Sequence, residues 1–153
     1  MIAAGFAIRT WVRNLDWTDD KTMAAAGVQT SPRSFKFHRL LAAQLLADDP
    51  SHRETDRAVA EADQSTAILA RLPDDLDLPG PWNLAAVSHR VKGDSLSGDA
   101  ARAQYEEALR LAFRSIAIDI ASGKGYDRRH GVESPVPASA ADGYRRRRRL
   151  IFI

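Results

Sequence analysis

Four histidines, His38, His52, His89 and His130, are the residues of this chain best suited to bind a metal or to transfer protons near neutral pH. They are far apart in the sequence and show no ligand spacing such as HExxH. A metal site needs three or four convergent ligands, and the chain has no cysteine to supply a thiolate or to form a disulfide. We therefore expect no metal and no cofactor.

Carboxylates gather in two short segments, DWTDD at 16–20 and LPDDLD at 72–77. Acid–base catalysis requires two carboxylates held in a pocket at different pKa values. Both segments instead lie at expected helix starts and loops, where aspartates cap free backbone amides. The segment GKGYD at 123–127 lacks the GKS or GKT ending of a phosphate-binding loop. No Ser/His/Asp triad follows from the spacing, so the sequence predicts no catalytic residue and no enzyme.

The C-terminal segment carries five consecutive arginines: Arg145, Arg146, Arg147, Arg148 and Arg149. The formal net charge of the whole chain is only +2, so the preceding part is mildly acidic. An arginine run can bind phosphates by releasing counterions, or it can contact anionic lipid. Only Tyr144 stands beside it to stack on a base, so we expect a solvated tail and consider nucleic acid an unlikely partner. Nucleic-acid or anionic-lipid binding through the arginines is kept as an alternative.

The remaining sequence predicts an all-α protein, because helical spacing recurs and β-branched and aromatic residues are sparse. Caps, prolines and glycines mark the expected ends of helices. The predicted helices span residues 2–13, about 18–30, 35–47, 54–72, 82–92 and 99–121. Gly123 is expected to stop the last helix in a left-handed conformation.

Three regions follow from this pattern. Residues 1–15 are an apolar helix or the stub of a transmembrane helix, since MIAAGFAI is apolar but too short to cross a bilayer. Residues 16–122 form a helical-repeat domain. Residues 123–153 combine glycine and proline with no helical period and are predicted to be a disordered basic tail.

A repeated pattern of small residues supports the helical-repeat domain. Ala60 is followed seven residues later by Ala67 and then Ile68, and Ala108 is followed seven residues later by Ser115 and then Ile116. Small residues seven apart lie on one face of a helix, so they let an antiparallel partner approach closely. The offset between the two patterns is 48 residues.

These features resemble the tetratricopeptide repeat (TPR) family. PWNLAAVSHRVKGD resembles the first helix of a repeat, and YEEALRLAFRSI resembles the second. The resemblance implies a short right-handed solenoid of antiparallel hairpins and a non-catalytic scaffold that binds a peptide or a partner domain on its concave face. The residues expected to pack the repeats are Trp17, Trp82, Ala85, Ala86 and Tyr105, with Ala60, Ala67, Ile68, Ala108, Ser115 and Ile116. The residues expected to line the groove are Lys36, His38, Gln44, Asn83 and His89.

A narrower resemblance rests on RNLDWTDD at 13–20. A similar stretch joins the last transmembrane helix to TPR repeats in membrane-embedded glycosyltransferases of the protein O-mannosyltransferase type. By this resemblance MIAAGFAI would end that helix, and Trp11 and Trp17 would lie at the membrane interface. The alternative function is then an accessory domain of such an enzyme, membrane-associated through its N-terminus, with the repeats on the extracytoplasmic side. If the chain is a scaffold without this membrane enzyme, a cytoplasmic location is also expected.

Overall fold

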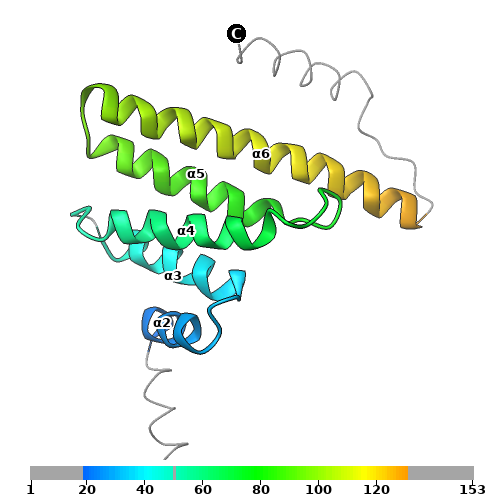
Figure 1. The fold of residues 1–153 in the computed structure, drawn as a ribbon, viewed down its shortest axis with the longest axis horizontal. Coiled ribbons are helices and arrows are strands. Elements are labelled where there is room, and N and C mark those ends of the chain that lie inside the picture. The colour runs from blue at the N-terminus through cyan, green and yellow to red at the C-terminus, as the bar shows by residue number, and fades with distance from the viewer. Residues whose placement is uncertain (1–18, 50, 131–153) are drawn as a thin grey trace, which may run out of the picture.

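The computed structural model describes residues 19–49 and 51–130, and these residues form five α-helices and no strand (Figure 1). The predicted all-α class is therefore confirmed. The helices are α2 (Asp20–Thr30), α3 (Phe35–Ala47), α4 (Thr55–Leu69), α5 (Pro79–Asp94) and α6 (Gly98–His130).

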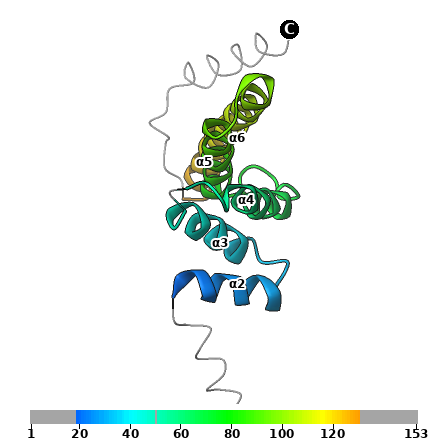
Figure 2. The same cartoon turned by 90° about the vertical axis from the view of Figure 1, so that its left-hand side faces the viewer.

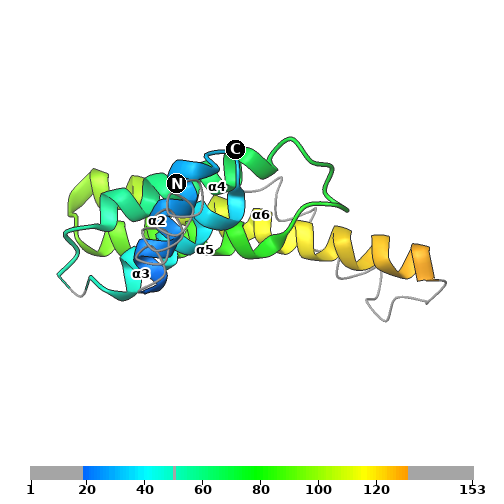
Figure 3. The ribbon, with the colours of Figure 1, turned by 90° about the horizontal axis from the view of Figure 1, so that it is seen from below.

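The helices stack in chain order, each against the one before it (Figure 1). Figure 2 shows the same stack from its side, with α2 at one end and α6 at the other. Besides its two chain neighbours, α3 also contacts α5. The C-terminal part of α6 extends beyond the other helices (Figure 3).

Helix starts follow the sequence signals closely. Asp19 caps α2 by accepting a hydrogen bond from the backbone N–H of Thr22 at 2.8 Å, as expected for an aspartate of the DWTDD segment. Pro79 and Pro81 lie in the first turn of α5, where a missing N–H costs nothing. They begin this helix three residues before the predicted start at Trp82.

The end of the last helix differs from the prediction. We expected the helix to stop near Ala121 with Gly123 in a left-handed conformation, but α6 continues to His130. Gly123 does not have a positive φ and lies inside the helix. The predicted boundary between the repeat domain and the tail at 122/123 therefore falls within α6.

Two apolar clusters hold the stack together. The first joins α3, α4, α5 and α6 and is built around Trp82 and Ala62; its buried members are Ala42, Ala62, Trp82, Ala85, Ala86, Leu111 and Ile118. The second joins α2, α3 and α4 through Ala24, Leu41, Leu45 and Ala58. Of the predicted packing residues, Trp82, Ala85, Ala86 and Ala108 are buried.

The predicted packing register of α4 is wrong by two residues. Ala60 and Ala67 are exposed, whereas Ala58, Ala62 and Ser65 of the same helix are buried. Ile68 is half-buried, and its predicted counterpart Ile116 is 48% exposed. Alanine occurs on both faces of α4, so the spacing of alanines alone could not select the buried face.

Two serines show the register that the structure uses. Ser65 Oγ donates to the carbonyl oxygen of Phe35 at 3.0 Å, and Ser115 Oγ donates to that of Pro79 at 2.9 Å. Each acceptor is the first residue of the preceding helix. The α3–α4 and α5–α6 hairpins are thus closed by the same contact, and Ser115 follows Ser65 by 50 residues rather than 48.

Glycines allow aromatic rings to contact helix backbones at two places. A Cβ on Gly27 of α2 would overlap the ring of Phe37. A Cβ on Gly93 of α5 would lie 2.7 Å from the ring of Tyr105. Tyr105 is 39% exposed, yet it packs between α5 and α6 in this way, in line with its predicted packing role.

We predict that Gly27→Ala lowers the free energy of unfolding by about 1–3 kcal/mol, because the new methyl group overlaps the Phe37 ring and forces α2 and α3 apart. The helix propensity of alanine offsets this by about 1 kcal/mol at most. Urea denaturation measures the difference. Gly80→Ala is the matched control, since a Cβ there has only Arg39 Nε at 3.9 Å. Equal stabilities for the two variants would contradict the close contact.

Candidate functional site

The five predicted groove residues divide into two groups. Lys36 of α3 and Asn83 of α5 are exposed, and Gln44 of α3 is half-buried. His38 and His89 are buried, with 6% and 7% of their surface exposed. The first group can meet a partner at the surface, whereas the two histidines contact other helices.

The rings of both buried histidines are engaged by polar groups of the fold. His38 Nδ1 lies 2.6 Å from Glu61 Oε2 of α4, and its Nε2 lies 3.0 Å from the carbonyl oxygen of Pro32. His89 Nε2 lies 3.1 Å from Asp63 Oδ1 of α4, and its Nδ1 lies 2.8 Å from Gln104 Oε1 of α6. Each histidine therefore joins the helix that carries it to neighbouring segments, and its nitrogens already have partners.

The electrostatic surroundings of His89 favour its protonated form. The hydrogen bond to Asp63 raises the pKa of His89 above its ordinary value of 6.5, against the opposing effect of burial, and Gln104 adds to the increase. Both ring nitrogens face oxygen acceptors, which suits a ring with two N–H donors. His89 thus links α4, α5 and α6 through its two ring nitrogens.

A second buried polar cluster surrounds Trp82. Asp77 accepts hydrogen bonds from Trp82 Nε1 at 3.0 Å and from the backbone N–H of Leu78 at 2.7 Å. Arg114 of α6 lies over the Trp82 ring, 5.2 Å from its centroid, and binds both carboxylate oxygens of Asp74 at 3.0 and 2.7 Å. Burial raises the pKa of Asp77, although these donors oppose that effect. Asp74 and Asp77 from LPDDLD therefore fix the α4–α5 loop against α5 and α6.

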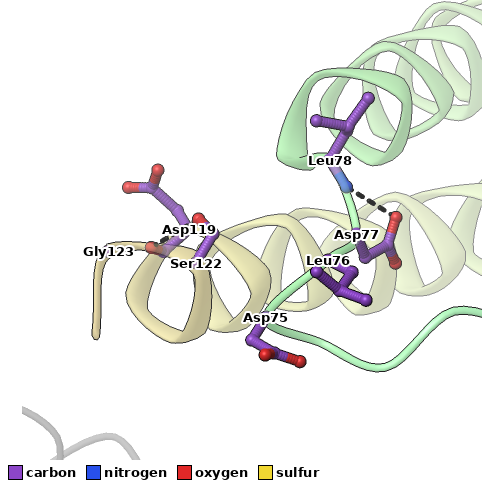
Figure 4. Close-up of a pocket in the computed structure, with 7 residues that line it drawn as sticks. All are labelled: Asp75, Leu76, Asp77, Leu78, Asp119, Ser122 and Gly123. Carbon is purple, nitrogen blue, oxygen red and sulfur yellow. Dashed lines mark hydrogen bonds between the residues drawn. The ribbon is translucent and has the colours of Figure 1, made fainter. Parts of the chain in front are cut away.

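A shallow depression of about 470 Å³ lies beside this loop and the C-terminal half of α6 (Figure 4). Its carboxylates are Asp75, Asp77 and Asp119, and Asp77 already has the partners described above. Ser122 Oγ donates to the carbonyl oxygen of Asp119 at 3.0 Å. The hydroxyl proton of Ser122 is therefore directed at the helix backbone and not at one of these carboxylates. The lining residues are Asp75, Leu76, Asp77, Leu78, Asp119, Ser122 and Gly123.

The outer faces of α3 and α5 form a different kind of surface. Arg39 Nε lies 3.9 Å from the position that a Cβ on Gly80 would occupy, so the two helices are close at this point. Lys36, Asn83 and Val87 are also exposed and follow helical spacing from Arg39 and Gly80, and we call Lys36, Arg39, Asn83 and Val87 the α3–α5 surface. Sequence reasoning missed Arg39 and Val87, although both follow helical spacing from Lys36 and Asn83.

The cations of the α3–α5 surface lack acidic partners within the described part of the chain. Neither Lys36 nor Arg39 forms an ion pair or hydrogen bond with another described residue through its side chain. In contrast, Lys92 of α5 is 3.0 Å from Asp56, and Arg90 is 3.0 Å from Asp94. Two cations are therefore free to bind a carboxylate from another molecule.

Within residues 19–49 and 51–130, no group of three or more histidine and acidic side chains is placed to hold a metal ion. No helix of this part is sufficiently long and apolar to span a membrane. Comparisons with protein-family models, with curated proteins and with solved structures found no match.

Several predicted features lie outside the described residues. These are the N-terminal segment 1–15, Trp17 and the five arginines from Arg145 to Arg149. Of the RNLDWTDD segment, only Asp19 and Asp20 are described, and they cap and begin α2.

We predict that His89 makes stability depend on pH. A folded-state pKa above the ordinary value of 6.5 means that this contribution is fully present below about pH 6.5 and is lost as pH rises through the folded-state pKa. His89→Gln should reduce that loss when unfolding free energy is measured by urea denaturation at several pH values. His52→Asn is the control, since His52 is exposed and asparagine tolerates its φ of 58°. If the unfolding free energy of His89→Gln depends on pH as steeply as that of the unmodified chain, His89 is not the source of this pH dependence.

We predict that Asp77→Ala destabilises the fold by about 1–3 kcal/mol, because the buried Trp82 Nε1–H is left without an acceptor and the partly buried Leu78 N–H loses its carboxylate partner. Asp75→Ala, in the same loop but exposed, should change stability by at most about 0.5 kcal/mol. Thermal and urea unfolding followed by far-UV circular dichroism compares the two. Similar losses in both variants would show that the Asp77 contacts contribute little.

Proposed function

We propose that this chain is a non-catalytic scaffold of the TPR type that binds an acidic peptide or an acidic partner domain on the α3–α5 surface. The observation that carries the proposal is the pair of cations Lys36 and Arg39, which have no side-chain partner among the described residues. Arg39 lies close to Gly80 of α5, the helix that also carries the exposed Asn83 and Val87. Cations supply affinity for carboxylates, an amide offers hydrogen bonds to a peptide backbone, and a valine offers apolar contact.

The helix order supports this assignment. α3 and α5 are the first helices of two hairpins that are closed by the same serine contact, and they contact each other directly. In a stack of hairpins, first helices brought side by side offer a continuous surface that an extended segment can follow. The second helix of each hairpin, α4 or α6, packs against the first and contributes no residue to the α3–α5 surface.

The buried histidines have an indirect part in this proposal. His38 and His89 hold α3 and α5 against α4, so they fix the helices that carry Lys36, Arg39 and Asn83. A pre-formed surface loses less conformational entropy on binding than one that must first be ordered. We therefore infer that the two histidines hold α3 and α5 in place, and that the exposed residues contact the partner.

We predict that peptides selected for binding to this chain from a phage-displayed random peptide library are enriched in aspartate and glutamate. Binding of the selected peptides should weaken at least about tenfold in the Lys36→Glu/Arg39→Glu variant, because two attractive charges become repulsive. It should also fall as salt is raised. Fluorescence anisotropy of labelled peptides gives the dissociation constants.

The control variant is Arg53→Glu, which changes one exposed cation in the connection between α3 and α4, at the opposite end of this hairpin from the Ser65–Phe35 contact. It should bind the selected peptides like the unmodified chain. Peptides that bind all variants equally, or a selection that yields no acidic bias, would count against the proposal.

A further inference from the structure

The loop that joins α4 to α5 carries three exposed leucines beside the C-terminal half of α6. Leu72, Leu76 and Leu78 are 41%, 54% and 45% exposed. Leu76 and Leu78 line the shallow depression described above, with loop residues on one side and Asp119 and Gly123 of α6 on the other (Figure 4). We call it the loop–α6 depression. Its volume of about 470 Å³ lies within the range of about 300–1,000 Å³ that is usual for binding clefts.

Two carboxylates that line the loop–α6 depression are not neutralised by the fold. Asp75 of the loop and Asp119 of α6 are exposed, and neither side chain forms an ion pair or hydrogen bond with another described residue. In contrast, Asp74 of the same loop binds Arg114 through both carboxylate oxygens, at 3.0 and 2.7 Å, in the forked geometry that guanidinium groups favour. A ligand suited to the depression therefore combines apolar side chains for the leucines with cations for the two free carboxylates.

We propose that residues 144–153 of the same chain, YRRRRRLIFI, cover the loop–α6 depression. The five consecutive arginines supply cations for Asp75 and Asp119. The four apolar residues that follow supply contacts for Leu76 and Leu78. This inference concerns a surface distinct from the α3–α5 surface and does not rest on the peptide-binding proposal.

The length of chain after α6 allows this segment to reach the depression. Gly123, which lines the depression, precedes the end of α6 at His130 by seven residues, or about 10 Å of helix. The 14 residues at 131–144 separate His130 from Arg145 and can span at most about 50 Å. Attachment to the same chain also gives the segment an effective concentration on the order of millimolar, so contacts that are weak individually are sufficient.

The place at which each end of the chain joins the stack favours the C-terminal segment over the N-terminal one. Residues 1–18 also combine arginines with apolar residues, but they join the chain at α2. Figure 2 shows α2 and α6 at opposite ends of the stack. Without knowledge of this surface, the sequence predicts a solvated arginine tail. The free carboxylates beside exposed leucines give that tail a partner within its own chain.

The first test uses the absence of native cysteine and follows disulfide formation in the full chain under mild oxidation. Leu76→Cys/Phe152→Cys should form an intramolecular disulfide at least about tenfold faster than Leu96→Cys/Phe152→Cys, after correction for the reactivity of each engineered thiol with free glutathione. Leu96 is the matched control, because it is similarly exposed at 41% but lies between α5 and α6, at the other end of α6. Equal rates overturn the proposal. A rate that rises with protein concentration also overturns it, because the segment would then reach another copy of the chain.

The second test removes the charge complementarity in the Leu76→Cys/Phe152→Cys chain. Asp75→Asn/Asp119→Asn should slow formation of the intramolecular disulfide by about fivefold, because two attractive contacts to arginine are lost. The matched control is Asp48→Asn/Asp99→Asn, which removes two exposed carboxylates outside the depression and should leave the rate unchanged. Equal rates in these two variants would show that the arginines do not bind Asp75 and Asp119, and would overturn the proposal.

Discussion

The hydrogen bond from a serine hydroxyl to the first carbonyl of the preceding helix sets the register of both hairpins. Ser65 binds Phe35 O and Ser115 binds Pro79 O at nearly the same distance. A bond of this kind tolerates no slip by one residue, since a shift would turn the hydroxyl away from its acceptor. The buried faces of α4 and α6 follow from it, with Ala58 and Ala108 at corresponding positions against their partner helices.

Buried polar contacts add specificity to a core that consists largely of alanine. Alanine side chains let helices approach closely. Because they are small and alike, however, they interdigitate little and do not favour one helix register over another. The carboxylates of Glu61, Asp63 and Asp77 instead reach His38, His89 and Trp82 at defined points. His38 is the fourth residue of α3 and Trp82 the fourth of α5, so the two hairpins place an aromatic ring bound to a carboxylate at the same position.

Much of the fold could be predicted from local chemistry, because caps, prolines and apolar spacing act within a few residues. The starts of α2 and α3 and the helical nature of the whole described region follow from such signals. The packing register of α4 could not be predicted in this way. Ala60 and Ala62 are the same residue type, and only the tertiary contacts distinguish the exposed residue from the buried one. The roles of His38 and His89 also depended on partners 23 and 26 residues away, which spacing within one helix cannot reveal.

The place of the serine bond along each hairpin has a consequence for how such units vary in length. Donor and acceptor are 30 residues apart in the first hairpin and 36 in the second, yet the acceptor is the first residue of its helix in both. The additional residues must therefore be accommodated toward the turn that joins the two helices. Hairpins of this design can gain six residues between donor and acceptor while the end that carries the serine contact keeps its alignment, which explains why no single repeat length describes the chain.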